Sequence, residues 1–188
     1  TYVGAVTFIM CSLMAIAQQD AKKVLAYSTI ANLGLIVICA GGGTKESIWA
    51  AILLIVFHAV SKSLLFLVVG STEHQIGNRN VENMDILLRV SKRLSIAMLI
   101  GIAGMFLAPF GMLISKWVAM KAFIDSNNLI IVIILAYGSA VTLFYWTKWM
   151  GIIVSNVKPE KKKSEKIYLE EELPIFLLAG LVVVSCLT

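Results

Sequence analysis

The residues with the clearest potential for chemistry are His58 and Lys62, four positions apart in the apolar segment IVFHAVSKSLLFLVVG (residues 55–70). An ionisable group inside a hydrocarbon span costs roughly 2.5 kcal/mol or more unless a partner offsets it. Residues four apart share one helix face, so we expect the imidazole and the ammonium group to be neighbours. Such a pair suits proton transfer rather than nucleophilic catalysis. A desolvated lysine gives up its proton more easily than one in water, an approaching carboxylate reverses this, and histidine titrates near ~6.5.

Lys62 is predicted to lie near the middle of its span. At a rise of 1.5 Å per residue it is about 21 Å from Ile48 and about 15 Å from Thr72, so its ammonium group cannot easily reach either interface. Ser61 flanks it and could support a proton path. The alternative is that Lys62 only serves packing, tied to a backbone carbonyl or to an acid on another helix.

The elements that carry these residues are predicted to be membrane spans. The 188-residue chain is 59% hydrophobic and 14% charged, with a mean hydropathy of +0.89, which excludes an ordinary soluble domain. Most of its apolar runs reach the ~17–25 residues that cross a hydrocarbon core. The runs are 3–17, 24–40, 48–69, 94–122, 129–154 and 173–187. We therefore predict an all-α polytopic membrane protein with about six transmembrane helices. Because the first and last runs are short, we expect the chain to be part of a longer protein.

The charges in the predicted loops indicate an orientation. Eleven basic residues lie in loops 18–23, 73–93 and 156–172, whereas the opposite side carries only Lys45 and Lys121. By the positive-inside rule, the three basic loops are cytoplasmic. The net charge of +5 is then explained by topology, without a nucleic-acid partner.

A second lysine, Lys116, follows a predicted break in the segment 94–125. As one straight helix this segment would be about 48 Å long, which exceeds a ~30 Å hydrocarbon core. Pro109 and Gly111 release backbone hydrogen bonds and permit a break. Beside such a break Lys116 would lie at mid depth, where transporters place ion sites. In a straight helix it would instead approach the far interface and extend its ammonium group to water.

Other polar residues of the spans could support a path. Lys148 is nearer the cytoplasmic end, among aromatic residues of the kind found at membrane interfaces, so both an interfacial position and a supporting role stay open. Ser28 and Asn32 could join helices by hydrogen bonds or hold water. The predicted spans contain no Asp or Glu that could pair with the lysines.

The remaining candidate ligands do not form a metal site. Cys11, Cys39 and Cys186 are isolated in apolar runs, and His74 has no second ligand at helical spacing. These patterns lack the spacing of metal or iron–sulfur sites. We therefore expect no metal, no cofactor and no catalytic centre on this chain.

Three segments carry a resemblance to a known family. They are QQDAKKVLAYSTIANLGLIV, FHAVSKSLLFLVVGS and LAPFGMLISKW. In this order and spacing they resemble segments of the proton-conducting antiporter-like subunits of respiratory complex I, Mrp-type sodium/proton antiporters and energy-converting hydrogenases. The resemblance covers roughly residues 4–155.

The resemblance implies a particular organisation of the chain. Residues 1–155 would form the second of two inverted five-helix repeats, with one discontinuous helix. A charged cytoplasmic loop (156–172) and the start of a further transmembrane helix (173–188) would follow.

The resemblance also implies roles for individual residues. Lys62 and Lys116 would be the lysines of a half channel, with His58 between water chains. The glutamate and the other buried lysine of the family belong to the first repeat, upstream of this one. Leu54 stands where many complex I members have a second histidine, so a relay through that position does not carry over.

The loop GNRNVENMDILLRVSKR is most similar to energy-converting hydrogenase and formate-hydrogenlyase relatives. It favours the large membrane subunit of an Ech-type [NiFe] hydrogenase in the prokaryotic cytoplasmic membrane. The implied function is translocation of H⁺, or of Na⁺, coupled to electron transfer in partner subunits. Those partners, other membrane subunits and a cytoplasmic redox arm, would hold the [NiFe] and iron–sulfur centres. The alternatives are an Mrp-type secondary antiporter subunit and a structural membrane scaffold with inert lysines.

Overall fold

A computed structural model describes residues 1–107, 111–155 and 169–185, and all regular secondary structure in these ranges is helical. The elements are α1 (Tyr2–Ile16), α2 (Ala21–Ala40), α3 (Lys45–Ile76), the 3-10 helix η1 (Val81–Ile86), α4 (Leu87–Val90), α5 (Lys92–Phe106), α6 (Gly111–Asp125), α7 (Leu129–Ser155) and α8 (Leu169–Val184). By length and composition, α2, α3, α5 with α6, and α7 can cross a membrane, and α1 and α8 are shorter apolar helices. The prediction of an all-α polytopic membrane protein is confirmed.

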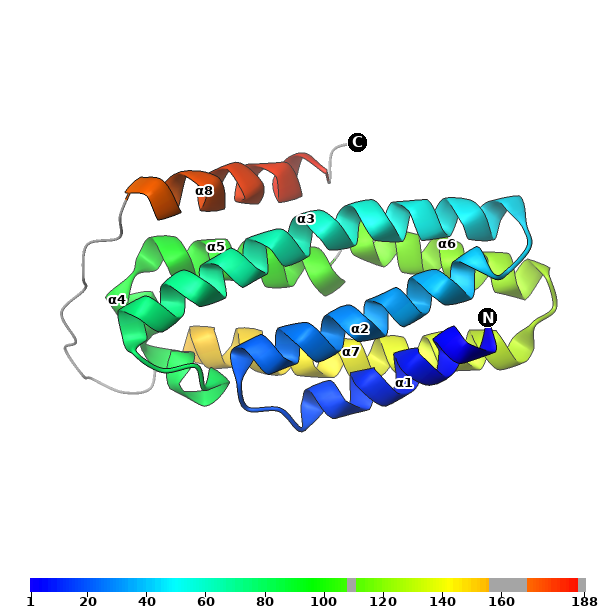
Figure 1. Cartoon of the computed structure of the whole chain (residues 1–188), viewed down its shortest axis with the longest axis horizontal. Helices are drawn as coiled ribbons and strands as arrows, with labels where there is room; N and C mark the ends of the chain where they lie inside the picture. The colour runs from blue at the N-terminus through cyan, green and yellow to red at the C-terminus, as the bar shows by residue number, and fades with distance from the viewer. Residues whose placement is uncertain (108–110, 156–168, 186–188) are drawn as a thin grey trace.

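The long helices lie roughly side by side, with α3 running along most of the bundle (Figure 1). α3 contacts α2, α5, α6 and α8, whereas α7 contacts α1, η1, α5 and α6. α5 and α6 follow one another in the same direction, so the segment from Lys92 to Asp125 crosses the bundle once. α2 and α3 each run the length of the bundle in opposite directions, so the connections α1–α2 and α3–η1 lie at the same end of the bundle (Figure 1).

Close contact between α1 and α2 depends on two glycines. A Cβ built on Gly34 would lie 2.8 Å from the Gly4 carbonyl oxygen, and one built on Gly4 would lie 2.6 Å from the Gly34 carbonyl oxygen. Helices in a membrane associate through small residues that let their backbones approach, because lipid supplies no hydrophobic driving force. The two glycines therefore set the separation of α1 and α2.

Two loops pair through their backbones at the end of the bundle near Gln19. The Ala21 amide donates to the Arg79 carbonyl at 2.9 Å, and the Val81 amide donates to the Gln19 carbonyl at 2.9 Å. Asp20 and Asn80 thereby form an isolated antiparallel bridge. We call this pairing of residues 19–21 with 79–81 the loop clasp.

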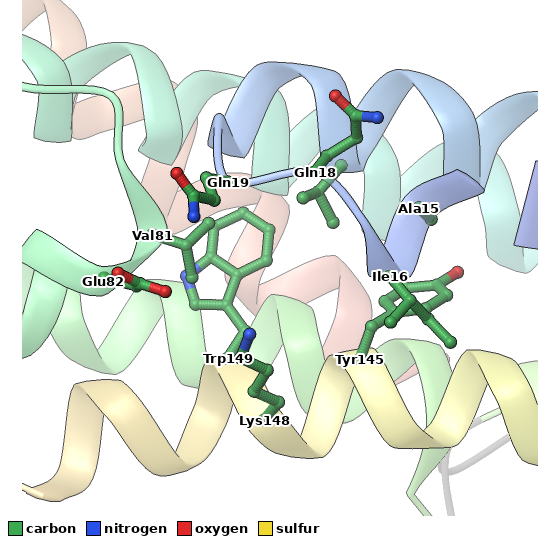
Figure 2. Close-up of a pocket in the computed structure, with 10 residues that line it drawn as sticks. Ala15, Ile16, Gln18, Gln19, Val81, Glu82, Tyr145, Lys148 and Trp149 are labelled. Atoms are coloured by element: carbon green, nitrogen blue, oxygen red, sulfur yellow. The ribbon is translucent and has the colours of Figure 1, made fainter. Parts of the chain in front are cut away.

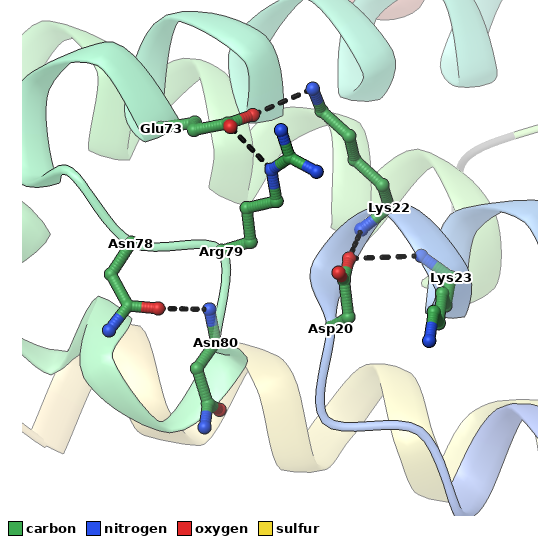
Figure 3. Close-up of polar contacts among 7 residues, drawn as sticks. All are labelled: Asp20, Lys22, Lys23, Glu73, Asn78, Arg79 and Asn80. Carbon is green, nitrogen blue, oxygen red and sulfur yellow. Dashed lines mark hydrogen bonds and ion pairs between the residues drawn. The ribbon is translucent and has the colours of Figure 1, made fainter.

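Side chains reinforce the loop clasp (Figure 3). The Glu73 carboxylate pairs with Lys22 Nζ at 2.6 Å and accepts a hydrogen bond from Arg79 Nε. Asp20 caps α2 by accepting from the amides of Lys22 and Lys23. Hydrogen bonds from Lys22 and then from Arg79 hold the pKa of the Glu73 carboxyl below its usual range. Glu73 lies in the last turn of a 32-residue helix, beyond the apolar run 48–69, so it can pair at the bundle end.

The helices begin and end at different residues from those predicted. The loop predicted at 18–23 is shorter in the structure because Asp20 caps α2, so Lys22 and Lys23 lie in the first turn of that helix. The loop predicted at 73–93 is also shorter, because α3 continues to Ile76. Gly77 caps the end of α3 in a left-handed conformation with φ 72°. η1 and α4 occupy most of the remainder. α8 begins at Leu169, before the predicted start at 173, and its Glu172 accepts hydrogen bonds from Arg93 Nη1 at 2.9 and 3.0 Å.

Replacing Gly34 with alanine tests the contact between α1 and α2. We expect Gly34→Ala to destabilise the purified full-length protein by about 1 to 3 kcal/mol, because the added methyl group would overlap backbone atoms of α1. Thermal unfolding in detergent measures the change. Gly151→Ala on α7 is the matched control, since a Cβ there meets no atom within 4 Å. Equal unfolding temperatures for the two variants would contradict the predicted contact.

The paired state of Glu73 predicts a pH-dependent stability. Its folded-state pKa lies below the unfolded value of about 4.3, so the cluster stabilises the fold above that value and stops doing so as the pH falls through the folded-state pKa. We expect Glu73→Gln to lower the unfolding temperature at neutral pH. The difference in unfolding temperature between the variant and the parent protein should disappear in acid. Asp125→Asn is the control, because the described residues show no ion pair for Asp125. A difference in unfolding temperature that stays constant with pH would contradict the predicted contribution of the Glu73 carboxylate.

Candidate functional site

Lys62 lies inside the bundle near the middle of α3, about 25 Å from its start and about 21 Å from its end. Only 5% of it is exposed. Its Nζ donates to the Leu25 carbonyl at 3.2 Å and makes a short hydrogen bond to Ser28 Oγ. Nζ also lies 4.9 Å from the centroid of the Trp146 ring, within the range of a cation–π contact. Among the described residues, no carboxylate forms an ion pair with Lys62.

Both hydrogen-bond acceptors of Lys62, the Leu25 carbonyl and Ser28 Oγ, lie in one turn of α2. Ser28 Oγ donates to the Leu25 carbonyl at 2.8 Å, which leaves its lone pairs facing Lys62. Asn32 Nδ2 donates to the Ser28 carbonyl at 2.8 Å, and its Oδ1 has no hydrogen-bond partner among the described residues. Ser28 and Asn32 are both buried and four residues apart, so they present polar atoms on one face of α2.

Lys116 lies in the second turn of α6, after the end of α5 at Phe106 and the extended residue Leu107. Its Nζ donates to Thr142 Oγ1 of α7 at 3.0 Å. α6 begins at Gly111, which packs against Phe57 of α3. The Phe57 ring leaves no room for a Cβ at this position. Pro109, the other residue assigned to the break, lies outside the described residues.

His58 lies on α3, one helical turn before Lys62. It is 6% exposed, and neither ring nitrogen has a hydrogen-bond partner among the described residues. The ring is close enough to both Lys62 and Lys116 to interact with each electrostatically. The structure thus brings together the three residues that the sequence singled out for the path.

One face of α7 contributes residues that sequence reasoning missed. Thr142, Tyr145, Trp146 and Trp149 are all buried, with exposed fractions of 1 to 4%. The Trp146 and Trp149 rings stack with centroids 5.8 Å apart. In the sequence these aromatic residues suit a membrane interface as well as a bundle interior, and the structure packs their shared face inside the bundle. Their spacing of three and four residues indicates that they share a face, whereas packing decides which way that face points.

Two residues predicted to support the path lie away from the hydrogen bonds of Lys62. Ser61 packs against α5, where a Cβ on Gly104 would lie 2.8 Å from Ser61 Oγ. Lys148 is exposed on α7 and lines a small pocket beside the loop clasp. A supporting role for either stays a prediction.

A larger pocket of about 360 Å³ opens beside Lys116 between α6 and α7. Apart from Lys116 and Ser139, its lining is apolar, with Trp117 68% exposed. Lys116 therefore faces the flank of the bundle as well as its interior. Within the described residues, no three His, Cys, Asp or Glu side chains are placed to hold a metal ion.

The chain is similar to proteins of membrane antiporters. It is 31% identical, over 98% of its length, to Na(+)/H(+) antiporter subunit A1 of Staphylococcus aureus (strain MRSA252), and covers 26% of that protein. It is 30% identical to the same subunit of strain JH9, with the same coverage. The chain therefore spans about a quarter of the length of these relatives.

Two solved structures share the fold. One is a chain of the membrane-bound sulfane sulfur reductase, an archaeal respiratory membrane complex, with a TM-score of 0.86 and 24% identity over 98% of this chain and 37% of that one. The other is in the Mrp complex from Dietzia sp. DQ12-45-1b, with a TM-score of 0.83 and 16% identity over 99% of this chain and 44% of that one. Residues 1–142 match the family model described as NADH:quinone oxidoreductase/Mrp antiporter, TM. The predicted resemblance to antiporter-like subunits is confirmed, and the chain belongs to the NADH:quinone oxidoreductase/Mrp antiporter transmembrane family.

Proposed function

We propose that this chain forms a lysine and histidine half channel that moves H⁺, with Na⁺ as the alternative ion, through a subunit of a multi-subunit membrane complex. The observation that carries the proposal is the buried Lys62 ammonium group, which is held by a carbonyl, a hydroxyl and an aromatic face. These acceptors are neutral, so Lys62 can lose its proton without leaving an unpaired carboxylate behind.

The arrangement favours an alternating occupancy of the three basic groups. His58 interacts with both Lys62 and Lys116, and positive charges that share a low-dielectric site titrate as a coupled set. A proton that arrives at one group therefore promotes release from another. An approaching carboxylate from an upstream repeat or a neighbouring subunit would bias this exchange, since opposite charge favours the protonated lysine.

For the source of energy, we propose coupling to electron transfer in partner subunits. The fold shared with a chain of a respiratory membrane complex supports this, as does the resemblance of the 73–93 loop to hydrogenase relatives. The partners would be other membrane subunits and a cytoplasmic redox arm that holds any [NiFe] and iron–sulfur centres. Loops 18–23, 73–93 and 156–172 would face the cytoplasm.

A second candidate function is secondary cation/proton antiport without a redox partner. The observation that favours it is the 31% identity to a Na(+)/H(+) antiporter subunit along 98% of this chain. Both candidates use the same half channel and differ in what drives it.

Replacing the buried lysines tests the half channel. We expect Lys62→Met and Lys116→Met to reduce proton flux through the reconstituted full complex by about 10²-fold, the lower range for loss of a positioned proton donor. A pH-sensitive dye inside proteoliposomes measures the flux. Lys121→Met, an exposed lysine at the end of α6, is the control. Unchanged flux in the first two variants, with equal or higher stability, would instead support the structural scaffold.

Purification of the full-length subunit from its native membrane separates the two drivers. If electron transfer drives the channel, soluble subunits with iron–sulfur absorbance should co-purify, and addition of their electron donor should acidify or alkalinise the vesicle lumen. If antiport is the function, the assembly should contain membrane subunits only, and a sodium gradient alone should move protons. The second result would contradict the redox-coupled proposal and leave the half channel intact.

A further inference from the structure

Each of the two buried lysines bonds to a hydroxyl group on a neighbouring helix. Lys62 Nζ of α3 donates to Ser28 Oγ of α2, and Lys116 Nζ of α6 donates to Thr142 Oγ1 of α7 at 3.0 Å. Both residues that carry the hydroxyls are buried, with exposed fractions of 0 and 1%. The two contacts therefore lie in the interior of the bundle.

The proton of each hydroxyl is tied to its own helix. Ser28 Oγ donates to the Leu25 carbonyl at 2.8 Å, and Thr142 Oγ1 donates to the Ser139 carbonyl at 2.8 Å. An ammonium group can only donate and a hydroxyl has a single proton, so a hydroxyl that accepts from a charged lysine gives its own proton to another group. At both positions this group is the carbonyl three residues earlier in the same helix.

This arrangement makes the two hydroxyls oriented acceptors for a charged lysine. A hydrogen bond to an ionised group is stronger than one between neutral groups, and a bond to the charged form favours that form. Each hydroxyl thus opposes the effect of burial, which favours the neutral amine. While the lysine is charged, the hydroxyl has no free proton to hand on, so it positions the lysine rather than carrying protons.

The two lysines depend on their hydroxyls to different extents. Lys62 also donates to the Leu25 carbonyl and lies against the Trp146 ring. For Lys116, Thr142 is the one hydrogen-bond partner among the described residues. Lys116 also borders the pocket of about 360 Å³ between α6 and α7, which gives its side chain space to move when the hydroxyl is absent. The loss of Thr142 is therefore expected to have the larger effect.

Few other titratable groups face the lysines. His58 of α3 is within electrostatic range of both, and no carboxylate of the described residues pairs with either. Tyr145 of α7 is buried near Ser28, and a phenol is neutral below its ordinary pKa of about 10. The other charged residues of α2, α5, α6 and α7 lie in the end turns or are exposed.

The small pocket beside the loop clasp does not replace either hydroxyl (Figure 2). Its lining includes Tyr145, Lys148 and Trp149 of α7, but neither Ser28 nor Thr142. Water in this pocket therefore does not contact the two hydroxyls, and a variant that lacks one of them also lacks that acceptor.

We propose that Ser28 and Thr142 are positioning residues that hold Lys62 and Lys116 in the same way, through a hydroxyl whose proton is tied to its own helix, and that they set the pH range over which the two lysines exchange protons. The inference rests on the proposed function, because it needs the lysines to change protonation state in transport. It deepens that function by assigning Thr142, a residue outside the predicted set, to the second lysine.

The test compares pH profiles of proton flux through the full complex in proteoliposomes. Thr142→Val keeps the shape of the side chain without the hydroxyl, and we expect the alkaline limb of its profile to move by about one pH unit towards acid. The reason is that a charged lysine that loses one hydrogen bond gives up its proton about tenfold more easily. Thr142→Ser should restore the parent profile. Ser28→Ala should shift the profile in the same direction by less, since Lys62 keeps its other contacts.

Matched controls remove hydroxyls that bond to their own helix but hold no lysine. Thr7 Oγ1 donates to the Val3 carbonyl and Ser95 Oγ donates to the Ser91 carbonyl, both at 2.9 Å. Neither bonds to a lysine among the described residues, so Thr7→Val and Ser95→Ala should keep the parent profile. A Thr142→Val flux that falls equally at every pH, without a shift, would overturn the proposal.

Lys116→Met in the same assay separates this inference from the half channel. If Lys116→Met abolishes flux while Thr142→Val keeps the parent profile, the half channel stands and the positioning role is wrong. If Lys116→Met keeps full flux at every pH, the half channel and the positioning role both fail.

Chemical labelling gives a second measurement that does not depend on transport. Phenyl isothiocyanate is lipid-soluble, reacts with neutral amines and can reach Lys116 through the pocket on the flank of the bundle. We expect Thr142→Val to raise the rate of Lys116 labelling in the full-length subunit at neutral pH by about tenfold, with no change at the exposed Lys121. Equal labelling of Lys116 in the parent protein and the variant, including none in either, would overturn the proposal.

Discussion

The arrangement of this bundle depends on one constraint, a lysine ammonium group in the middle of a long apolar helix. Lys62 needs hydrogen-bond acceptors, and the described residues offer it no carboxylate. The Leu25 carbonyl and Ser28 of α2 meet it on one side, and the Trp146 face of α7 on the other. Because burying an unsatisfied charge is so unfavourable, this requirement fixes how α2 and α7 are rotated about their axes relative to α3.

The rotation of α7 then determines where the second lysine can dock. Thr142 and Trp146 are one helical turn apart, so they share a face. Lys116 reaches Thr142 from α6 and Lys62 reaches Trp146 from α3. The separation of α5 from α6 allows α6 to begin close against α3, with Gly111 at the contact. His58 is consequently held within electrostatic range of both ammonium groups.

The sequence predicted the charged members of the site because a lysine or a histidine in an apolar run is rare for a physical reason. It could not predict the aromatic face of α7, since Tyr145, Trp146 and Trp149 have side chains that suit both an interface and a bundle interior, and only packing decides between them. The loop bounds shifted for a related reason. Capping by Asp20 and by Gly77 extends the helices into segments that look like loops from their charge. The small pocket beside the loop clasp depends on the pairing of Asp20 with Asn80, two positions that no local pattern connects.

The charges at the end of the bundle and those in its interior are satisfied in opposite ways, and this difference fits the separate roles that we propose for them. Glu73 is paired with two cations, so adding a proton to it breaks favourable contacts, and its charge is fixed at neutral pH. Lys62 and Lys116 bond to neutral oxygens, so removing a proton leaves no opposite charge unpaired. The first arrangement resists protonation and holds the loops together. The second leaves no opposite charge unpaired when a proton is lost, which suits the proton transfer that we propose for these lysines.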